Sequence, residues 1–298
     1  MSRWVRNRLG PGSRAVVQGI QRRACQLVVA DGALLILSAR DVPLAPNGLT
    51  LDGPRRTLED TGIRVGQVVA LGGSAPADSG AAWRVTLDAA ATWEPCPPVH
   101  RVLPQGLAER LRMARAAVVA EATGESLLPL LWASESDAAG LRPGVVRAAA
   151  APARLLSGAA IRRDETSLVR AARGLAGLGP GLTPSGDDLL AGFAAAWTLV
   201  GESLDLDGAA RRRVTEALLA GAARGASPLG RAWLEHACRG ELLEPMTGFA
   251  GVLLAEETRD VGTAVRGVLA VGSSSGTDWM VGFLLGAGTT LAARVRPW

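Results

Sequence analysis

The sequence predicts an α+β protein in which a small N-terminal β barrel or sandwich precedes a larger all-α domain. Short apolar runs separated by turn signals fill the N-terminal third, and helical periodicity fills the rest. Between them lies the proline-rich segment Glu94-Pro95-Cys96-Pro97-Pro98. We therefore expect a β-rich domain over residues 1–96 and an all-α domain over residues 97–298.

The strands of the first domain are predicted from turn residues and apolar runs. Asp31-Gly32 is a strong two-residue hairpin signal, because both central positions of such a turn favour positive φ. Pro46-Asn47-Gly48 indicates a second turn. The expected strands are Val28–Ala30, Ala33–Leu37, Leu49–Leu51, Gln67–Leu71 and Trp83–Leu87, with a loop rich in Gly, Ala and Ser before the last. Short strands at this spacing are typical of a small barrel or sandwich.

The helices of the second domain are predicted from apolar residues at helical spacing with charges on the opposite face. They are expected at Leu107–Ala122, Ser126–Ala133, Pro143–Ser157, Glu165–Leu175, Asp187–Val200, Gly208–Ala223, Pro228–Arg239, Thr247–Glu256, Val261–Ala270 and Thr277–Ala293. Many are rich in Ala and Gly, which lets facing helices approach closely.

Composition excludes several kinds of catalysis. The chain has 298 residues, of which 48% are apolar and 20% charged, as is usual for a globular protein. All 32 basic residues are Arg, and there is no Tyr. Schiff-base chemistry, a P-loop lysine, a Ser–Lys pair and a Tyr acid or base are therefore excluded. With His100 and His236 as its only histidines, one chain cannot form a multi-His metal site.

Cysteine usage and the lack of apolar segments point to the cytoplasm. Cys25, Cys96 and Cys238 are odd in number and lack CxxC spacing, which argues against disulfides and a Cys-rich zinc site. The first residues show no signal-peptide pattern. The uncharged run Trp279–Ala293 is too short and too rich in Gly and Thr to span a bilayer. We expect a cytoplasmic protein without membrane contact.

Positive charge is concentrated at the N-terminus. Residues 1–23 hold six Arg and no acid, within a formal net charge of +4. Such an arm could bind nucleic acid. The alternative, an exposed segment kept soluble by Arg, is favoured, because Trp4 is the only aromatic residue there and no stacking platform follows.

The most informative feature is a duplicated motif of the form S-G-x-D-φ-φ-x-G-F, where φ is apolar. It occurs at Ser185–Phe193 and again at Ser275–Phe283. The first copy follows the glycine-rich loop Gly177–Pro184, and the second follows Gly272-Ser-Ser. Both copies precede an uncharged helix.

Two interpretations of the motif remain open. In the structural one, Ser185 and Asp188 form a capping box, and the later Gly and Phe allow close packing. In the functional one, glycine-rich loops present free N–H groups at helix N-termini, where anions bind. If the two starts meet, they would offer four to six N–H donors, with hydroxyl and carboxylate groups. One of the two acids would then orient a ligand, with Asp187 slightly favoured because Asp188 holds the capping-box position. The pair could also hold Mg²⁺, although capping is the favoured alternative.

A third helix start is predicted at Ser227-Pro228, with Ser as N-cap and Pro at the first helical position. Arg231 lies one turn inside that helix. Because the chain has no Lys, any bidentate clamp on a carboxylate or phosphate must come from Arg.

The run GLGPGLTPSGDDLLAGF at Gly177–Phe193 resembles the domain-of-unknown-function family that contains AllH, a subunit associated with oxamate carbamoyltransferase. Four other segments resemble the family as well: Pro46–Leu49, Ala91–Pro95, Ser227–Gly240 and Gly272–Gly282. In the family pattern a His often precedes the late Ser-Ser-Gly. This sequence has Ser273 there, so a His-dependent proton transfer is not expected.

The resemblance implies partners and a reaction. The partners are an acyl-CoA-synthetase-like FdrA subunit and an AllG-type subunit, and the complex would transfer a carbamoyl group between oxalurate and phosphate, in purine or allantoin catabolism. A non-catalytic assembly or ligand-binding subunit is the alternative. Such transfer needs an anion cradle and donors for a tetrahedral oxyanion.

The candidate residues follow from the motifs and the resemblance together. The candidate catalytic residues are Ser185, Asp187 and Asp188. The candidate substrate-binding residues are Gly179, Gly181, Thr183, Gly186, Ser227, Arg231, Ser274, Ser275, Gly276 and Asp278. No metal site and no cofactor is expected, with Mg²⁺ as the one possible addition.

Overall fold

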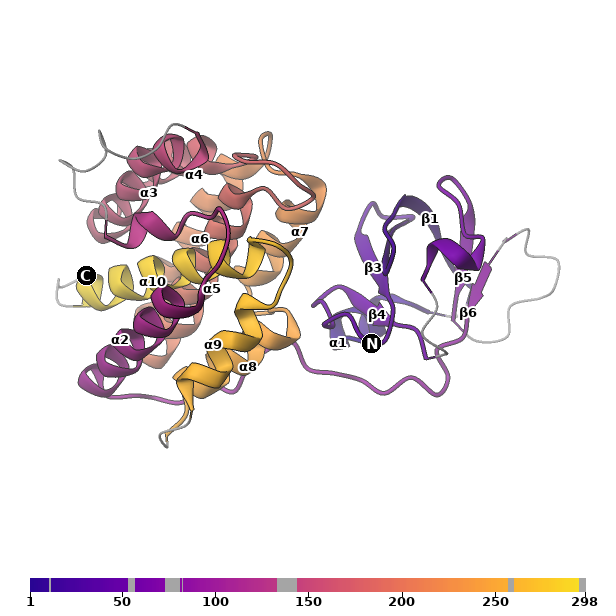
Figure 1. The fold of residues 1–298 in the computed structure, drawn as a ribbon, viewed down its shortest axis with the longest axis horizontal. Helices are drawn as coiled ribbons and strands as arrows, with labels where there is room; N and C mark the ends of the chain where they lie inside the picture. Colours follow the sequence, from indigo (N-terminus) through magenta and orange to yellow (C-terminus); the bar gives the residue numbers. More distant parts are fainter. Residues whose placement is uncertain are drawn as a thin grey trace. The chain divides into compact units, whose positions relative to one another are not determined.

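The chain folds into two compact units, Met1–Pro95 and Cys96–Trp298 (Figure 1). The structure is a computed structural model, and it describes residues 1–10, 12–52, 57–72, 81, 83–132, 144–256 and 260–294. The expected loop rich in Gly, Ala and Ser before Trp83 lies mostly outside the described residues. So do Ala133 and Pro143, which the predicted helices included.

The first unit is a single curled, mixed sheet of six strands, so the barrel-like alternative is the closer one. The strand order is β4-β3-β2-β1-β5-β6, antiparallel in the middle, with parallel pairs β3–β4 and β5–β6. The strands are β1 (Ser13–Ile20), β2 (Ala24–Val29), β3 (Leu34–Ser38), β4 (Gly48–Thr50), β5 (Val68–Leu71) and β6 (Trp83–Val85), with a 3-10 turn, η1 (Glu59–Thr61).

The predicted hairpin joins β2 and β3, but its turn differs from the expected type. Only Gly32 has a positive φ, of 83°, and Asp31 does not. The Asp31 side chain instead accepts a hydrogen bond from the Ala33 N–H, at 3.0 Å. An Asx turn therefore supplies the bend that a second positive φ would have supplied.

The arginines of the N-terminal segment are exposed, as expected, but the segment itself is folded into the first unit. It forms α1 (Arg3–Arg8), and Val5 in this helix is fully buried in the core of the unit. Arg3 pairs with Glu94, and Arg8 pairs with Asp31 and lies over the Trp4 ring. Arg3 and Arg8 thus make contacts within the first unit.

The second unit is all-α among its described residues, as predicted. Its helices are α2 (Pro104–Glu121), α3 (Val145–Arg162), α4 (Glu165–Leu175), α5 (Ser185–Ser203), α6 (Gly208–Ala222), α7 (Pro228–Ala237), α8 (Glu244–Leu253), α9 (Val261–Leu269) and α10 (Ser275–Arg294), with a 3-10 turn, η2 (Leu128–Leu131). No described helix is both long enough and apolar enough to cross a membrane.

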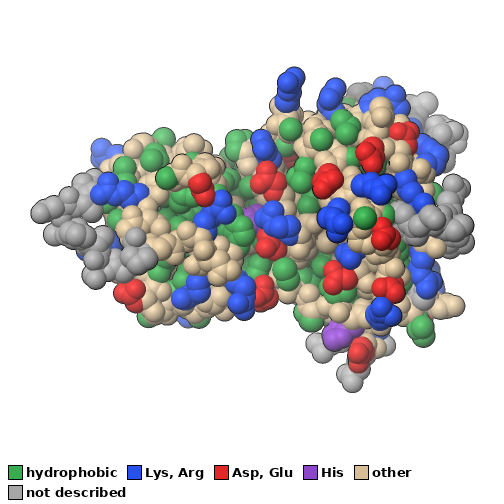
Figure 2. Space-filling view, turned by 180° about the vertical axis from the view of Figure 1, so that it is seen from behind, with side chains coloured by type: hydrophobic (Ala, Val, Ile, Leu, Met, Phe, Trp, Pro, Cys, Tyr) green, Lys and Arg blue, Asp and Glu red, His purple; other side chains and the backbone are tan. Residues whose placement is uncertain are grey.

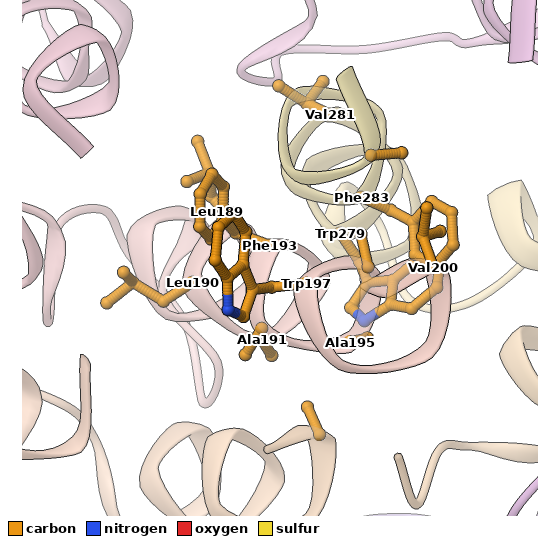
Figure 3. Packing of buried hydrophobic residues seen from close by; sticks show 14 of the residues in the cluster. Leu189, Leu190, Ala191, Phe193, Ala195, Trp197, Val200, Trp279, Val281 and Phe283 are labelled. Carbon is orange, nitrogen blue, oxygen red and sulfur yellow. The ribbon is translucent and has the colours of Figure 1, made fainter. Parts of the chain in front are cut away.

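The core of this unit is built on α5 and α10, which are buried over most of their lengths. Figure 3 shows two groups of aromatic rings in this core, Phe193 and Trp197 from α5 and Trp279 and Phe283 from α10. The first two rings stack with centroids 6.5 Å apart, and the last two are tilted, with centroids 5.0 Å apart. Two motif residues, Phe193 and Phe283, thus fill the core as the structural interpretation expects.

The motif glycines hold α5 and α10 in contact. A Cβ on Gly192 would lie 2.0 Å from the Trp279 carbonyl oxygen, and a Cβ on Gly282 would lie 2.0 Å from that of Leu189. No side chain fits at such a distance. Trp279 is four residues after the start of α10, and Leu189 is four residues after the start of α5. The two contacts are therefore symmetric, and the helices run side by side with their N-termini together.

The duplication is longer than the motif itself. α4 begins at the N-cap Asp164, whose side chain accepts from the Ser167 N–H, and leads through a loop to α5. α9 begins at the N-cap Asp260, whose side chain accepts from the Thr263 N–H, and leads to α10. The helical unit therefore contains two copies of an Asp-capped helix, a loop and a buried glycine-containing helix.

Candidate functional site

The starts of α5 and α10 meet through their hydroxyl groups. Thr183 Oγ1 lies 3.0 Å from Ser275 Oγ, which joins the loop before α5 to the first residue of α10. The Ser275 hydroxyl also lies beside the Asp188 carboxyl, while the Ser185 and Ser274 hydroxyls lie beside that of Asp278. We call this group the paired start: Thr183, Ser185, Asp188, Ser274, Ser275 and Asp278.

The capping-box interpretation of Ser185 and Asp188 is wrong. Pro184 is the N-cap of α5 and makes no side-chain capping bond, so Ser185 is already the first helical residue. The Asp188 N–H donates to the Pro184 carbonyl, at 3.1 Å. Both side chains are thereby freed to face α10 instead of capping their own helix.

Asp187 links three segments of backbone. Its Oδ1 accepts from the Gly177 N–H at 2.7 Å, and its Oδ2 accepts from the Ser227 N–H at 2.8 Å. Gly230 makes room for it, because a Cβ there would lie 2.3 Å from Oδ2. Both carboxylate oxygens are hydrogen-bonded and the residue is 2% exposed, so the presence of an acid at position 187 is explained without a ligand or a metal.

Ser227 is the N-cap of α7, as predicted, and it fixes the glycine-rich loop. Its hydroxyl accepts from the Gly230 N–H at 3.0 Å and donates to the Leu182 carbonyl at 2.8 Å. The start of α7 is thus tied to the loop that precedes α5, which brings a third helix N-terminus to the paired start.

Asp188 is a buried acid without a full set of partners. It is 3% exposed, and its Oδ2 makes no hydrogen bond with any described residue. Burial raises the pKa of Asp188 well above its ordinary 3.8; the Asp278 carboxyl raises it further, against the opposing effect of the Ser275 and Thr183 hydroxyls. The structure thus keeps a carboxyl group where ionisation is unfavourable.

Asp278 is also a buried acid with one unpaired oxygen, and its other oxygen has a hydrogen-bond partner that the sequence did not reveal. Its Oδ1 accepts from the Leu127 N–H at 2.6 Å, at the start of η2, while Oδ2 is unpaired among the described residues. Burial raises the pKa of Asp278, and the hydrogen bond from Leu127 opposes this. No sequence signal at Leu127 indicates this long-range contact.

The expected cradle of free N–H groups is smaller than predicted. The Gly186 N–H donates to the Leu178 carbonyl at 2.9 Å, and the Gly276 N–H donates to that of Val271 at 3.0 Å. A Cβ on either glycine would lie 1.9 Å from a backbone oxygen, of Leu175 and Val268 respectively. These two candidate substrate-binding residues therefore have packing roles.

The other candidates lie at the edge of the site. Gly179 and Gly181 have φ of 112° and 103°, values that favour glycine, and Gly181 is exposed. Arg231 is exposed on α7 and pairs with Glu235 at 3.0 Å. Its guanidinium is thus engaged on the helix surface. On the face in Figure 2, basic and acidic side chains of the helical unit are intermixed.

Histidine and cysteine residues do not add a catalytic group to the site. His236 is buried, with Nδ1 2.5 Å from Glu241 Oε2, and burial lowers its pKa. Burial raises the pKa of the Cys238 thiol to about 12, so it is not a thiolate at neutral pH. Among the described residues, no group of three or more acidic, His or Cys side chains is placed to hold a metal ion.

The fold and the paired start define a helical module with a duplicated loop–helix motif. Residues 175–287 match the model of the family described as oxamate carbamoyltransferase subunit AllH. The resemblance found in the sequence is confirmed over this segment, which runs from the end of α4 into α10 and so contains both copies of the motif. No curated protein and no solved structure shows significant similarity to the chain. The family description implies a subunit of an oxamate carbamoyltransferase complex.

Proposed function

We propose that this chain is a subunit of a carbamoyltransferase-type complex and binds a small anionic substrate at the paired start. One observation carries the proposal: the family match spans both copies of the motif, and the loop before the first copy meets the first residue of the second, with Thr183 Oγ1 3.0 Å from Ser275 Oγ. The glycine contacts between α5 and α10 bring the two starts together, and the groups that meet there, hydroxyls at helix N-termini, are those that an anion-binding site uses.

Helix N-termini supply the attraction for the anion. α5, α10 and α7 all begin here, and each N-terminus carries about half a positive charge. The hydroxyls of Thr183, Ser274 and Ser275, all half-buried, are the accessible donors. Oxamate or oxalurate would bind through its carboxylate, and phosphate would be the acceptor of the carbamoyl group. The acids are then orienting groups, with Asp188 the better candidate than Asp187.

Catalysis would need partner chains. We propose FdrA-like and AllG-like subunits as these partners, because the resemblance to the AllH family implies them. The chain itself has no Lys or Tyr, and the described site holds no His. The transfer breaks the bond between the carbamoyl carbon and the oxalurate nitrogen and forms one to a phosphate oxygen; oxamate leaves, and its nitrogen takes the proton that hydrogen phosphate loses. The chain described here would hold the anion and stabilise the developing oxyanion with hydroxyl groups.

The proposal is tested by calorimetric titration of the full chain with oxamate, oxalurate and phosphate. Saturable binding of at least one is expected, weakened about tenfold or more by Ser275→Ala, which corresponds to about 1.4 kcal/mol. Ser157→Ala, a half-buried serine on α3, is the matched control and should leave affinity unchanged.

The alternative is a non-catalytic assembly subunit. It is favoured by the structural roles of Asp187, Gly186 and Gly276, which account for much of the motif without a ligand. If none of the three compounds binds, with the fold verified by circular dichroism, the substrate-binding proposal is wrong and the assembly role stands.

A further inference from the structure

The three aspartates of the motif differ in how well their oxygens are paired. Asp187 has both oxygens in hydrogen bonds from backbone N–H groups. Asp188 and Asp278, 3% and 0% exposed, each have an Oδ2 that no described residue partners. Buried polar atoms in native proteins almost always have a partner, and an exception calls for an explanation. An unpaired acceptor requires a donor from elsewhere.

Asp188 has an unpaired oxygen although the charged side chains around it are also carboxyls. The charged side chains that act on it are two further carboxyls, Asp278 and Asp187, and its polar neighbours are the Ser275 and Thr183 hydroxyls. Asp278 in turn faces Leu127, Ser185 and Ser274. The positive ends of α5, α10 and α7 partly offset this negative charge. Unpaired acceptors thus lie beside positive helix ends.

This combination selects a particular ligand chemistry. Positive helix ends and hydroxyl groups favour an anionic group, but phosphate and dicarboxylates present mainly acceptor oxygens, which Oδ2 of the ionised Asp188 carboxyl would repel. An anion that also carries N–H groups satisfies both requirements. Its carboxylate lies against the helix ends, and its N–H donates to the unpaired carboxyl oxygen.

We infer that Asp188 is a specificity-determining residue of the paired start, where its Oδ2 accepts a hydrogen bond from the carbamoyl or amide N–H of a small anionic ligand. This inference rests on the proposed function. The half-buried hydroxyls of Thr183 and Ser275 lie beside the carboxyl, so a ligand reaches it by replacing their mutual contact. Acceptor-only anions bind less well, because their oxygens would face a carboxyl oxygen.

A matched pair of ligands tests the inference. Oxamate and oxalate differ in one position, where oxamate has NH₂ and oxalate has a carboxylate oxygen. Calorimetric titration of the full chain is expected to give at least tenfold tighter binding of oxamate. In Asp188→Asn that preference is expected to fall about tenfold, because the Asn amide can donate to oxalate and carries no charge.

Asp187→Asn is the control acid, because its hydrogen bonds go to backbone N–H groups. It should change the affinities for oxamate and oxalate by the same factor, so that their ratio stays as in the wild type. If Asp188→Asn does not fold, the wild type alone is titrated at two pH values. Protonation of Asp188 at the lower pH should reduce the preference for oxamate, because a neutral carboxyl can donate to oxalate.

The outcomes separate the inference from the proposed function. Equal affinity of the wild type for the two ligands overturns the inference and leaves the proposed function standing. An unchanged preference in a folded Asp188→Asn variant does the same. If oxamate, oxalurate, oxalate and phosphate all fail to bind, the proposed function fails as well.

Discussion

The starts of α5 and α10 share their packing residues and differ in their acids. Gly186 and Gly276 both lie against a carbonyl of the preceding helix, and Gly192 and Gly282 both lie against the opposite core helix. At the third position of the motif, however, Asp187 stands in one copy and Thr277 in the other.

This difference separates two kinds of requirement. The repeated glycines are required by the contact between two backbones, which is the same from either side. Asp187 is required by one neighbour, because the N–H of Ser227 at the start of α7 donates to it. The second copy meets η2 instead, and there Asp278 accepts from the Leu127 N–H. Each copy thus holds one extra segment, with a different acid.

The largest loss of stability is expected when a side chain is added to a glycine at the contact between α5 and α10. Gly282→Ala would place a Cβ 2.0 Å from the Leu189 carbonyl oxygen and should lower the free energy of unfolding by about 3 kcal/mol. Gly288→Ala on the same helix is the control, since its Cβ meets nothing within 4 Å; it should raise stability by about 0.5–1 kcal/mol. Urea unfolding measures both, and similar values for the two would contradict the role assigned to Gly282.

The next largest loss of stability is expected at Asp187, the acid that only the first copy has. Asp187→Asn should cost about 1–3 kcal/mol, because an Asn side chain can accept only one of the two N–H bonds and turns its own N–H toward the other donor. Asp207→Asn, at an N-cap that accepts from one N–H, should cost a few tenths of a kcal/mol. A loss at Asp187 no larger than at Asp207 would show that the link to α7 is weak.

A pH-dependent effect is expected at Asp188. Its pKa is raised in the folded protein, so the folded state binds more protons than the unfolded one above pH 3.8, and stability falls as the pH rises from there through the raised pKa. Each unit of pKa difference corresponds to about 1.4 kcal/mol.

Asp188→Asn removes that penalty, so its stability relative to the wild type should increase from pH 4 to pH 7. Urea unfolding at several pH values measures this difference. A constant difference across the range would mean that the pKa of Asp188 is not raised.

The smallest change in stability is expected on α7, the helix whose start is hydrogen-bonded to the first copy through Asp187. Arg231→Ala breaks an exposed pair with Glu235 and should change stability by less than about 0.5 kcal/mol. If Arg231 clamps the substrate, oxamate affinity should fall about tenfold. Glu235→Ala removes the same ion pair but leaves the cation, so its affinity should stay near the wild-type value. Equal affinities of both variants and the wild type would remove Arg231 from the site.

The sequence by itself determined the α+β class, the proline-rich segment between the β-rich and helical parts, the hairpin at Asp31-Gly32 and the start of α7 at Ser227. It did so because these features depend on local chemistry: apolar periodicity, turn residues and capping. The resemblance to AllH came from a local run of residues as well, and the family match includes that run.

Only the tertiary structure decided what each acid of the motif does. Asp187 and Asp188 are neighbours in sequence, yet one bonds the backbone at Gly177 and Ser227, and the other faces α10 with an oxygen unpaired. Adjacent helical residues point about 100° apart, and what each meets depends on segments far along the chain. For the same reason the partner of Asp278 at Leu127, 151 residues away, was beyond prediction from local pattern.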